Sequence, residues 1–243
     1  MKTWRTARGT VIARLLAGRS NVFLVSREGR NVLVDTSPAW RWNKLRRRLR
    51  RLGIASLDAL VLTHAHFDHA GSAARLQKEF SVPVIVHRAE AGALAGGEST
   101  LPEGTNRLAR FLVARLRRLA AGHARCAPSR ADVLAVGRLD LREYGVGAWV
   151  LHTPGHTPGS QSVIVDDEIA LVGDAMFGVF PGSAFPPFAC DADQLVASWG
   201  RLLDTGCRLF LPSHGSANSR RLLERDHQRR RSRSEFAGGR ARR

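Results

Sequence analysis

Three imidazoles and one carboxylate lie within six positions of one another, directly after the apolar run 57–62. In an extended chain, residues two positions apart point to the same side, so His64 and His66 can bind one metal ion. Asp68 and His69 follow where the chain turns and can reach a second ion. Helical zinc ligation instead places two histidines four residues apart. Imidazole and carboxylate groups without a thiolate favour zinc, iron or manganese in a catalytic site over a closed structural zinc site.

Further candidate ligands each follow an apolar, strand-prone run of their own. The runs are 148–151, 169–172 and 208–211, and the candidates that follow them are His156, Asp174 and His214. Loops at strand ends are where a rigid scaffold positions binding groups. We therefore expect four strand ends to meet at one site.

These motifs resemble the pattern of the metallo-β-lactamase superfamily of hydrolases: HxHxDH, then Gly-His-Thr, Gly-Asp and Ser/Gly-His-Gly. The resemblance covers about residues 10 to 215. It implies an α/β fold, a four-layer αβ/βα sandwich of two mixed β-sheets flanked by helices, with the metals at one edge between the sheets. The aspartate at position 174 resembles the glyoxalase II and lactonase-like branch, because the antibiotic-degrading members usually carry a cysteine or another non-bridging ligand there.

The resemblance also implies a ligand for each coordination position. The first ion is held by His64, His66 and His156, the second by Asp68, His69 and His214, and Asp174 bridges the two. His152 is the nearest competitor to His156 as third ligand of the first ion, although a packing role or a hydrogen bond to a ligand is the expectation for it.

Two divalent ions are therefore the expected cofactors, with zinc first and iron or manganese as alternatives. Such ions would hold a bridging hydroxide for attack on a carbonyl or phosphoryl group. Asp68 and Asp174 are the predicted catalytic carboxylates, because they can orient that hydroxide. Neutral imidazole ligands also need hydrogen-bonding groups behind them. The nearest polar candidates in the sequence are Asp58, Thr63, Thr157 and Ser213.

Composition is that of one enzyme domain. The 243 residues are 44% apolar, enough for a substantial core, which we assign to residues 1–228. Residues 229–243 are arginine-rich with little apolar content and are predicted to be a disordered tail. No run is long and apolar enough to span a membrane. The three cysteines are odd in number and widely spaced, which favours the reducing cytoplasm; Cys190 is the alternative nucleophile.

The net charge of +17 is concentrated in three segments. Residues 41–51, 105–130 and 220–243 each carry +7, which leaves the rest of the chain at −4. Such segments can bind nucleic acid through its phosphates. For 41–51 and 105–130 we favour a solvated helix face, because apolar residues such as Leu45 and Leu49 follow a helical period.

The expected elements support the same architecture. Helices are predicted at about 41–52, 72–80, 105–121 and 192–204. Strands are predicted at 11–16, 22–25, 32–34, 83–86 and at the four ligand-bearing runs, with 161–165 turning back into 169–172. Residues 88–104 and 178–191 are the segments expected to wall the substrate pocket.

The substrate class is narrowed by what the chain lacks. Phe177 stands three residues after Asp174, where the lactonases that this chain resembles have a catalytic tyrosine. Residues 216–243 are too few for the glutathione-binding domain of glyoxalase II. We expect a cytoplasmic dinuclear metallohydrolase that acts on a small ester, thioester or lactone. The alternatives are a phosphodiesterase acting on nucleic acid and a non-catalytic metal-binding protein.

Overall fold

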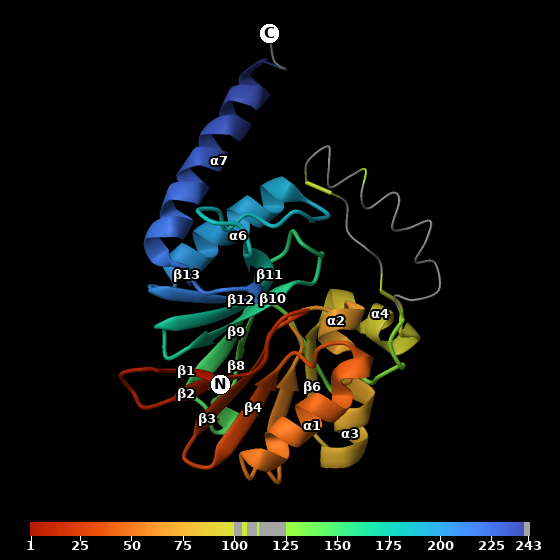
Figure 1. Ribbon diagram of the computed structural model, residues 1–243. Helices are drawn as coiled ribbons and strands as arrows, with labels where there is room; N and C mark the ends of the chain where they lie inside the picture. Colours follow the sequence, from red (N-terminus) through yellow and green to blue (C-terminus); the bar gives the residue numbers. More distant parts are fainter. Residues whose placement is uncertain (100–103, 106–110, 112–124, 241–243) are drawn as a thin grey trace.

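Two mixed β-sheets lie face to face in the computed structural model, which describes residues 1–99, 104, 105, 111 and 125–240 (Figure 1). The first sheet has the order of the sequence: β1 (Lys2–Arg5), β2 (Val11–Leu16), β3 (Val22–Arg27), β4 (Arg30–Val34), β5 (Ala59–Val61), β6 (Val84–His87) and β7 (Val133–Ala135). Its strands are antiparallel up to β4 and parallel from β4 to β7. The carboxyl ends of β4, β5 and β6 therefore meet at one edge.

The second sheet runs in the reverse order of the sequence. From one edge to the other it comprises β13 (Asn218–Ser219), β12 (Leu209–Gly215), β11 (Ile169–Gly178), β10 (Gln161–Val165), β9 (Ala148–His152) and β8 (Arg138–Asp140). Only β11 and β12 are parallel among these pairs of described residues. Their pairing shifts register around Gly173 and again before Phe177, which takes Asp174 out of the regular ladder.

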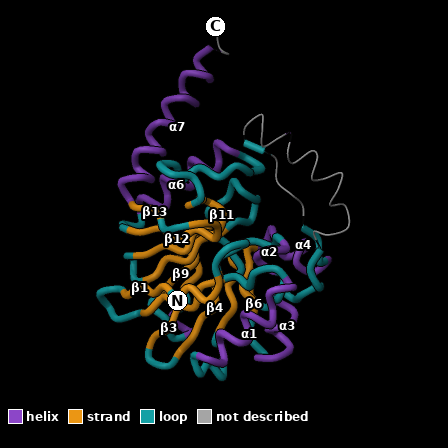
Figure 2. Tube along the Cα trace, in the orientation of Figure 1, coloured by secondary structure: helices purple, strands orange, loops and turns teal. Residues whose placement is uncertain are grey.

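Helices cover the outer faces of both sheets (Figure 2). The first sheet is flanked by α1 (Trp42–Arg51) and α3 (Ala73–Phe80), with α2 (Phe67–Ala70) and α4 (Ala91–Gly96) near its ligand-bearing edge; the second sheet is flanked by α6 (Ala192–Asp204) and the start of α7 (Arg220–Arg240). Short 3-10 turns form η1 (Ala39–Arg41), η2 (Arg88–Glu90) and η3 (Arg142–Tyr144). The predicted four-layer αβ/βα sandwich is confirmed.

Three apolar clusters fill the spaces between the four layers. Successive side chains of a strand point to opposite faces, so one strand contributes to two clusters. In β10, Val163 and Val165 pack between the sheets, whereas Ile164 packs with Trp199 of α6. Leu49 of α1 lies fully buried in the third cluster, outside the first sheet. Burying an aliphatic side chain of this size contributes about 1.5–3 kcal/mol. The strand ends are thus held on a rigid frame.

The basic segment 41–51 forms the predicted amphipathic helix. Leu45 and Leu49 of α1 are completely buried, while Arg47, Arg50 and Arg51 are exposed. Most of the helix predicted at 105–121 lies outside the described residues. Among the helices that the structure describes, none combines the length and apolar character needed to cross a bilayer.

The boundary predicted at Gln228 falls inside α7, which the structure continues to Arg240. Leu223 and Asp226 are the last buried side chains of its described part, and Arg229, Arg231 and Ser232 are exposed. Figure 1 shows the helix leaving the body of the molecule. An isolated arginine-rich helix has little tertiary packing to stabilise it, so a tail that is disordered in solution stays a prediction.

Deleting residues 229–243 should leave the thermal midpoint within about 2 °C of the full chain, because no described side chain beyond Asp226 is buried. Salt-titrated binding to single- and double-stranded nucleic acid, run on both forms, tests a role for the arginines. If they contact phosphates, only the full chain will bind, with an affinity that falls steeply with salt. A large loss of stability on truncation would contradict the predicted boundary.

Candidate metal centre

The structure brings all seven predicted ligand residues together at one edge between the two sheets. They come from the segment between β5 and α2, from α2 itself, from the loop after β9, from β11 and from β12: His64, His66, Asp68, His69, His156, Asp174 and His214. Residues more than a hundred positions apart in the sequence therefore meet within the reach of a metal ion.

The first group consists of three buried imidazoles. The Nδ1 atom of His66 lies 2.9 Å from Nε2 of His64 and 3.2 Å from Nε2 of His156. Burial lowers the pKa of His64 and of His156, and the neighbouring imidazoles lower the pKa of His64 further. Neutral imidazole is the form that binds metal. The group could hold one divalent ion.

The second group is more polar and more open. The Nε2 atom of His69 lies 3.8 Å from Oδ1 of Asp68, and Nε2 of His214 lies 3.6 Å from Oδ2 of Asp68. The side chains of Asp68 and His214 are 15% and 16% exposed. This mixture of imidazole and carboxylate could hold a second divalent ion.

Asp174 stands between the two groups. Its Oδ2 lies 3.4 Å from Nε2 of His156, whereas its Oδ1 lies 3.5 Å from Nε2 of His69 and 3.3 Å from Nε2 of His214. One carboxylate oxygen thus faces each group. Burial alone would raise the pKa of Asp174, but His214, His69 and His156 hold it well below its usual range.

Two buried polar atoms in this cluster fit a bound cation. The Oδ1 atom of Asp174 and the Nε2 atom of His69 are both buried without a hydrogen-bond partner among the described residues. Leaving such atoms unpaired costs about 1–3 kcal/mol each. A divalent ion between them would satisfy both, so the residues present fit the metal that the motifs imply.

A residue that the sequence analysis missed, Asp35, supports the second group. It follows β4 and is 1% exposed, and its Oδ2 accepts a hydrogen bond from Nδ1 of His69 at 2.8 Å and from Oγ of Ser213 at 3.0 Å. Its Oδ1 accepts from the backbone N–H of Thr63 at 2.8 Å. The carboxylate fixes the imidazole of His69 with its Nε2 atom toward the ligands.

The other predicted supporting groups divide into two sets. Thr63 and Ser213 both bond to Asp35 and so belong to the site. Asp58 instead pairs with Arg30 at 2.9 Å, and Thr157 bonds to Ser160. The imidazole of His156 is supported by a main-chain group that the sequence analysis did not predict: its Nδ1 lies 3.0 Å from the carbonyl oxygen of Phe188.

His152 lies outside all the candidate ligand groups of the described residues. Its ring stacks on His87 with centroids 4.0 Å apart, and its Nε2 lies 2.9 Å from the carbonyl oxygen of Pro158. The position supports His156, not His152, as the third ligand of the first group.

Aromatic side chains border the cluster. Trp40 is 67% exposed and lies 5.9 Å from the ring of Phe67, which stands between the ligands His66 and Asp68 in the sequence. On the side of β11 and β12, the ring of Phe177 lies 4.7 Å from that of His214. Phe180, 47% exposed, follows in the predicted wall segment 178–191.

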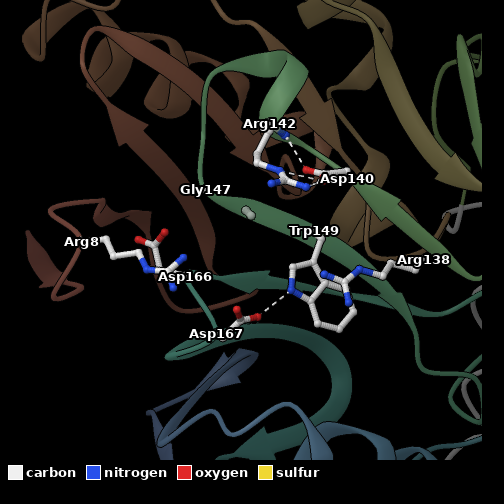
Figure 3. A pocket seen from close by; sticks show the side chains of 9 residues that line it. Arg8, Arg138, Asp140, Arg142, Gly147, Trp149, Asp166 and Asp167 are labelled. Carbon is white, nitrogen blue, oxygen red and sulfur yellow. Dashed lines mark hydrogen bonds and ion pairs between the residues drawn. The ribbon is translucent and has the colours of Figure 1, made fainter.

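A separate cavity of about 120 Å³ lies at the opposite end of β9 from His152 (Figure 3). Its charged side chains largely bond to each other or to the ring of Trp149: Arg142 pairs with Asp140, and Arg138 lies 3.9 Å above the indole. The indole N–H donates to Asp167 at 2.8 Å. None of the seven candidate ligands lines it, so it is distinct from the metal centre.

Comparisons with known proteins agree with this geometry. A family model for the metallo-beta-lactamase superfamily matches residues 15–214. The chain belongs to that superfamily. The family and the enzyme class predicted from the sequence, a metal-dependent hydrolase, are thereby confirmed.

Individual members of the superfamily are distant from this chain. The probable metallo-hydrolase MJ0888 of Methanocaldococcus jannaschii is 28% identical over 158 residues, which are 65% of this chain and 68% of that protein. Hydroxyacylglutathione hydrolase GloC of Haemophilus influenzae is 25% identical over 203 residues, 77% of this chain and 80% of that protein. The solved structure of TTHA1623 in a di-iron-bound form is 27% identical, covers 88% of this chain and 97% of that chain, and has a TM-score of 0.62.

Replacing Asp35 with asparagine should weaken metal binding at the second group by about 10–100-fold, because the amide cannot accept from His69 and Ser213 with the strength of a carboxylate. Chelator competition with zinc, read by metal analysis, measures the affinity. Asp58→Asn is the matched control, since it removes a largely buried carboxylate that bonds to Arg30 and Asn31. Equal affinities in the Asp35 variant and the control would contradict the role of Asp35.

Metal binding at the second group should release a proton. Burial lowers the pKa of His69, but Asp35, Asp174 and Asp68 together raise it to about 10. His69 is therefore protonated at pH 7 in the metal-free protein, and a metal ligand must be neutral. Affinity for the second ion should rise with pH up to about 10. Titration calorimetry at pH 7 in buffers of different ionisation enthalpy counts the protons; no release would refute the assignment.

Proposed function

We propose that this chain is a dinuclear metallohydrolase of a small ester, thioester or lactone, with zinc as the first choice of metal and iron or manganese as the alternatives. Position 174 carries the proposal: one carboxylate presents its two oxygens to two different ligand groups, 3.3–3.5 Å from the nearest imidazole nitrogens. Four ligands complete a tetrahedral zinc site, so the seven candidate ligands are more than one ion can bind. TTHA1623, whose solved form contains two irons, supports the same view.

The proposed ligand sets follow the geometry. His64, His66 and His156 would hold the first ion, Asp68, His69 and His214 would hold the second, and Asp174 would serve both. When bound, two divalent ions supply a Lewis acid for the substrate oxygen and a water molecule with a pKa near neutrality.

The chain's own carboxylates have distinct tasks in this proposal. Asp174 is 5% exposed and lies between the two groups, where it would orient a nucleophilic water. Asp68 has a side chain that is 15% exposed. It is therefore the carboxylate that can accept a proton from the water and pass it toward the leaving group.

Carbonyl substrates are favoured over phosphodiesters by the surroundings of the site. Trp40 and Phe67 offer apolar surface, with the guanidinium of Arg19 6.0 Å from the Phe67 ring as a cation beside them, and the chain has no lysine or arginine between Arg142 and Arg201. A bound phosphodiester needs cationic or dipolar donors around its non-bridging oxygens. Phe177 supplies no phenol beside His214, which makes a lactone the least favoured of the three carbonyl classes. The relative GloC is named a hydroxyacylglutathione hydrolase, which supports an acyl substrate for this chain.

The proposal is tested by metal analysis and by one substrate panel. Protein reconstituted with zinc, manganese or iron should bind about two ions per chain. Aryl ester, thioester, lactone and phosphodiester substrates with matched leaving groups are then compared. We expect kcat/KM for the best ester or thioester to exceed that for the phosphodiester by more than about tenfold, or 1.4 kcal/mol.

The test variant for this panel is Asp174→Asn, which keeps the size of the side chain but removes its charge, and Asp167→Asn is the control. The Asp174 variant should lose activity and one ion together, whereas Asp167→Asn, at the other end of the second sheet, should change neither. Efficient phosphodiester cleavage with all carbonyl substrates untouched would replace the proposal with the nuclease alternative. Binding of one ion or none would refute the dinuclear site.

A further inference from the structure

A second buried carboxylate, Glu90, lies behind the first ligand group. It stands at the end of η2 and the start of α4 and is 5% exposed. Its Oε2 accepts a hydrogen bond from the backbone N–H of Ala65 at 3.0 Å, and its Oε1 accepts from the backbone N–H of Gly159 at 3.0 Å. Both oxygens are thus used, and both partners are main-chain groups.

The two partners belong to the two segments that carry the ligands of the first group. Ala65 stands between His64 and His66, and Gly159 lies three residues after His156. Asp35 reaches the His64–His66 segment through Thr63, which bonds to it and whose hydroxyl lies 3.2 Å from Nδ1 of His64. Its other partners are His69 and Ser213, a candidate ligand of the second group and the residue before another. Glu90 is the buried carboxylate that joins the His64–His66 segment to the loop after His156.

The chemistry of the pair of bonds requires a carboxylate. Two N–H groups that converge on one side chain need two acceptors and no donor, which an ionised glutamate provides. Glutamine of the same length would accept from one N–H and direct its own amide hydrogens at the other. Burying a charge is costly unless hydrogen bonds satisfy it, and the two main-chain N–H groups supply those bonds to Glu90.

The contact with Gly159 is also sterically specific. A Cβ atom on this residue would lie 2.5 Å from Cγ of Glu90, closer than real atoms approach. Glycine therefore allows the loop after His156 to close directly on the carboxylate. The same backbone conformation carries no positive φ, so alanine at this position would be excluded by Glu90 and not by strain in the main chain.

We propose that Glu90 is a positioning residue for the first metal, which ties the His64–His66 segment to the His156 loop so that three imidazoles converge. The inference rests on the proposed metal sites. Gln161 makes a second, separate link between the same regions: its backbone N–H donates to the carbonyl of Thr63 at 2.9 Å and its side chain donates to the carbonyl of Leu62 at 2.8 Å. We therefore expect the fold to form without the two bonds of Glu90.

The test measures metal binding without substrate. Wild type and Glu90→Gln are titrated with Co²⁺ against a chelator, and the exchangeable imidazole protons shifted by the bound ion are followed by NMR. We expect the first ion to bind about 10–100-fold more weakly, with loss of the shifted protons of His64, His66 and His156. The protons of His69 and His214 should persist. Glu79→Gln, which removes a surface partner of Arg46, should leave both sets unchanged.

A second variant approaches the same contact from the other side. Gly159→Ala should push Glu90 away and produce the same selective loss, whereas Gly92→Ala in α4, where an added Cβ meets nothing within 4 Å, should not. Two ions bound with wild-type affinity in both Glu90→Gln and Gly159→Ala would overturn the role of Glu90 alone. If neither variant folds, Glu90 is a folding element and the positioning role is wrong. A wild type that binds no ion would overturn both this role and the proposed function.

Discussion

One buried carboxylate joins the two sheets where the ligands meet. Asp35 follows β4 in the first sheet. Its carboxylate accepts hydrogen bonds from Ser213 in β12 of the second sheet and from His69 in α2. Its backbone adopts a φ of 60°, a left-handed conformation that aspartate tolerates better than most residues. A sandwich whose sheets contact only through aliphatic side chains could slide by fractions of an ångström. The directional bonds of Asp35, together with those of Gln161 and Asn21, oppose such sliding at the edge where small displacements would separate a ligand from its ion.

The resemblance of the motifs to the superfamily pattern predicted the seven candidate ligands, and the structure brings them together. The apolar runs before them form β9 and the first parts of β11 and β12, so His156 lies in the loop after β9, whereas Asp174 and His214 lie within their strands. The three runs lead to the same edge because β9, β11 and β12 share one direction, while β10 between β9 and β11 runs the opposite way. Fold and ligand positions were therefore predictable together, since both depend on the same strands.

The supporting residues were harder to predict because their partners are distant in sequence. Asp35 follows the apolar run Val32–Val34 just as the ligands follow theirs, so the same rule could have identified it. Glu90 does not directly follow an apolar run, so this rule does not identify it. It lies in a short 3-10 turn, and its partners are main-chain N–H groups of residues 65 and 159, which no side-chain pattern reveals. From the sequence, Asp58 was an equally good candidate for a hydrogen bond to a metal ligand. In the structure it instead pairs with Arg30 and accepts from the backbone N–H of Asn31, at the opposite end of β4.

The segment 178–191 is anchored at both ends on the ligand frame. The carbonyl of Gly178 accepts from the N–H of Ser216 at 3.0 Å, and the N–H of Asp191 donates to Gly155 at 2.9 Å, so each end is fixed beside a ligand loop. Lengthening a surface loop between fixed ends costs little, about 0.6 kcal/mol for each doubling. The stretch between Gly178 and Phe188 can therefore change in length and side chains with little cost to the ligand frame, provided that the carbonyl oxygen of Phe188 stays beside His156.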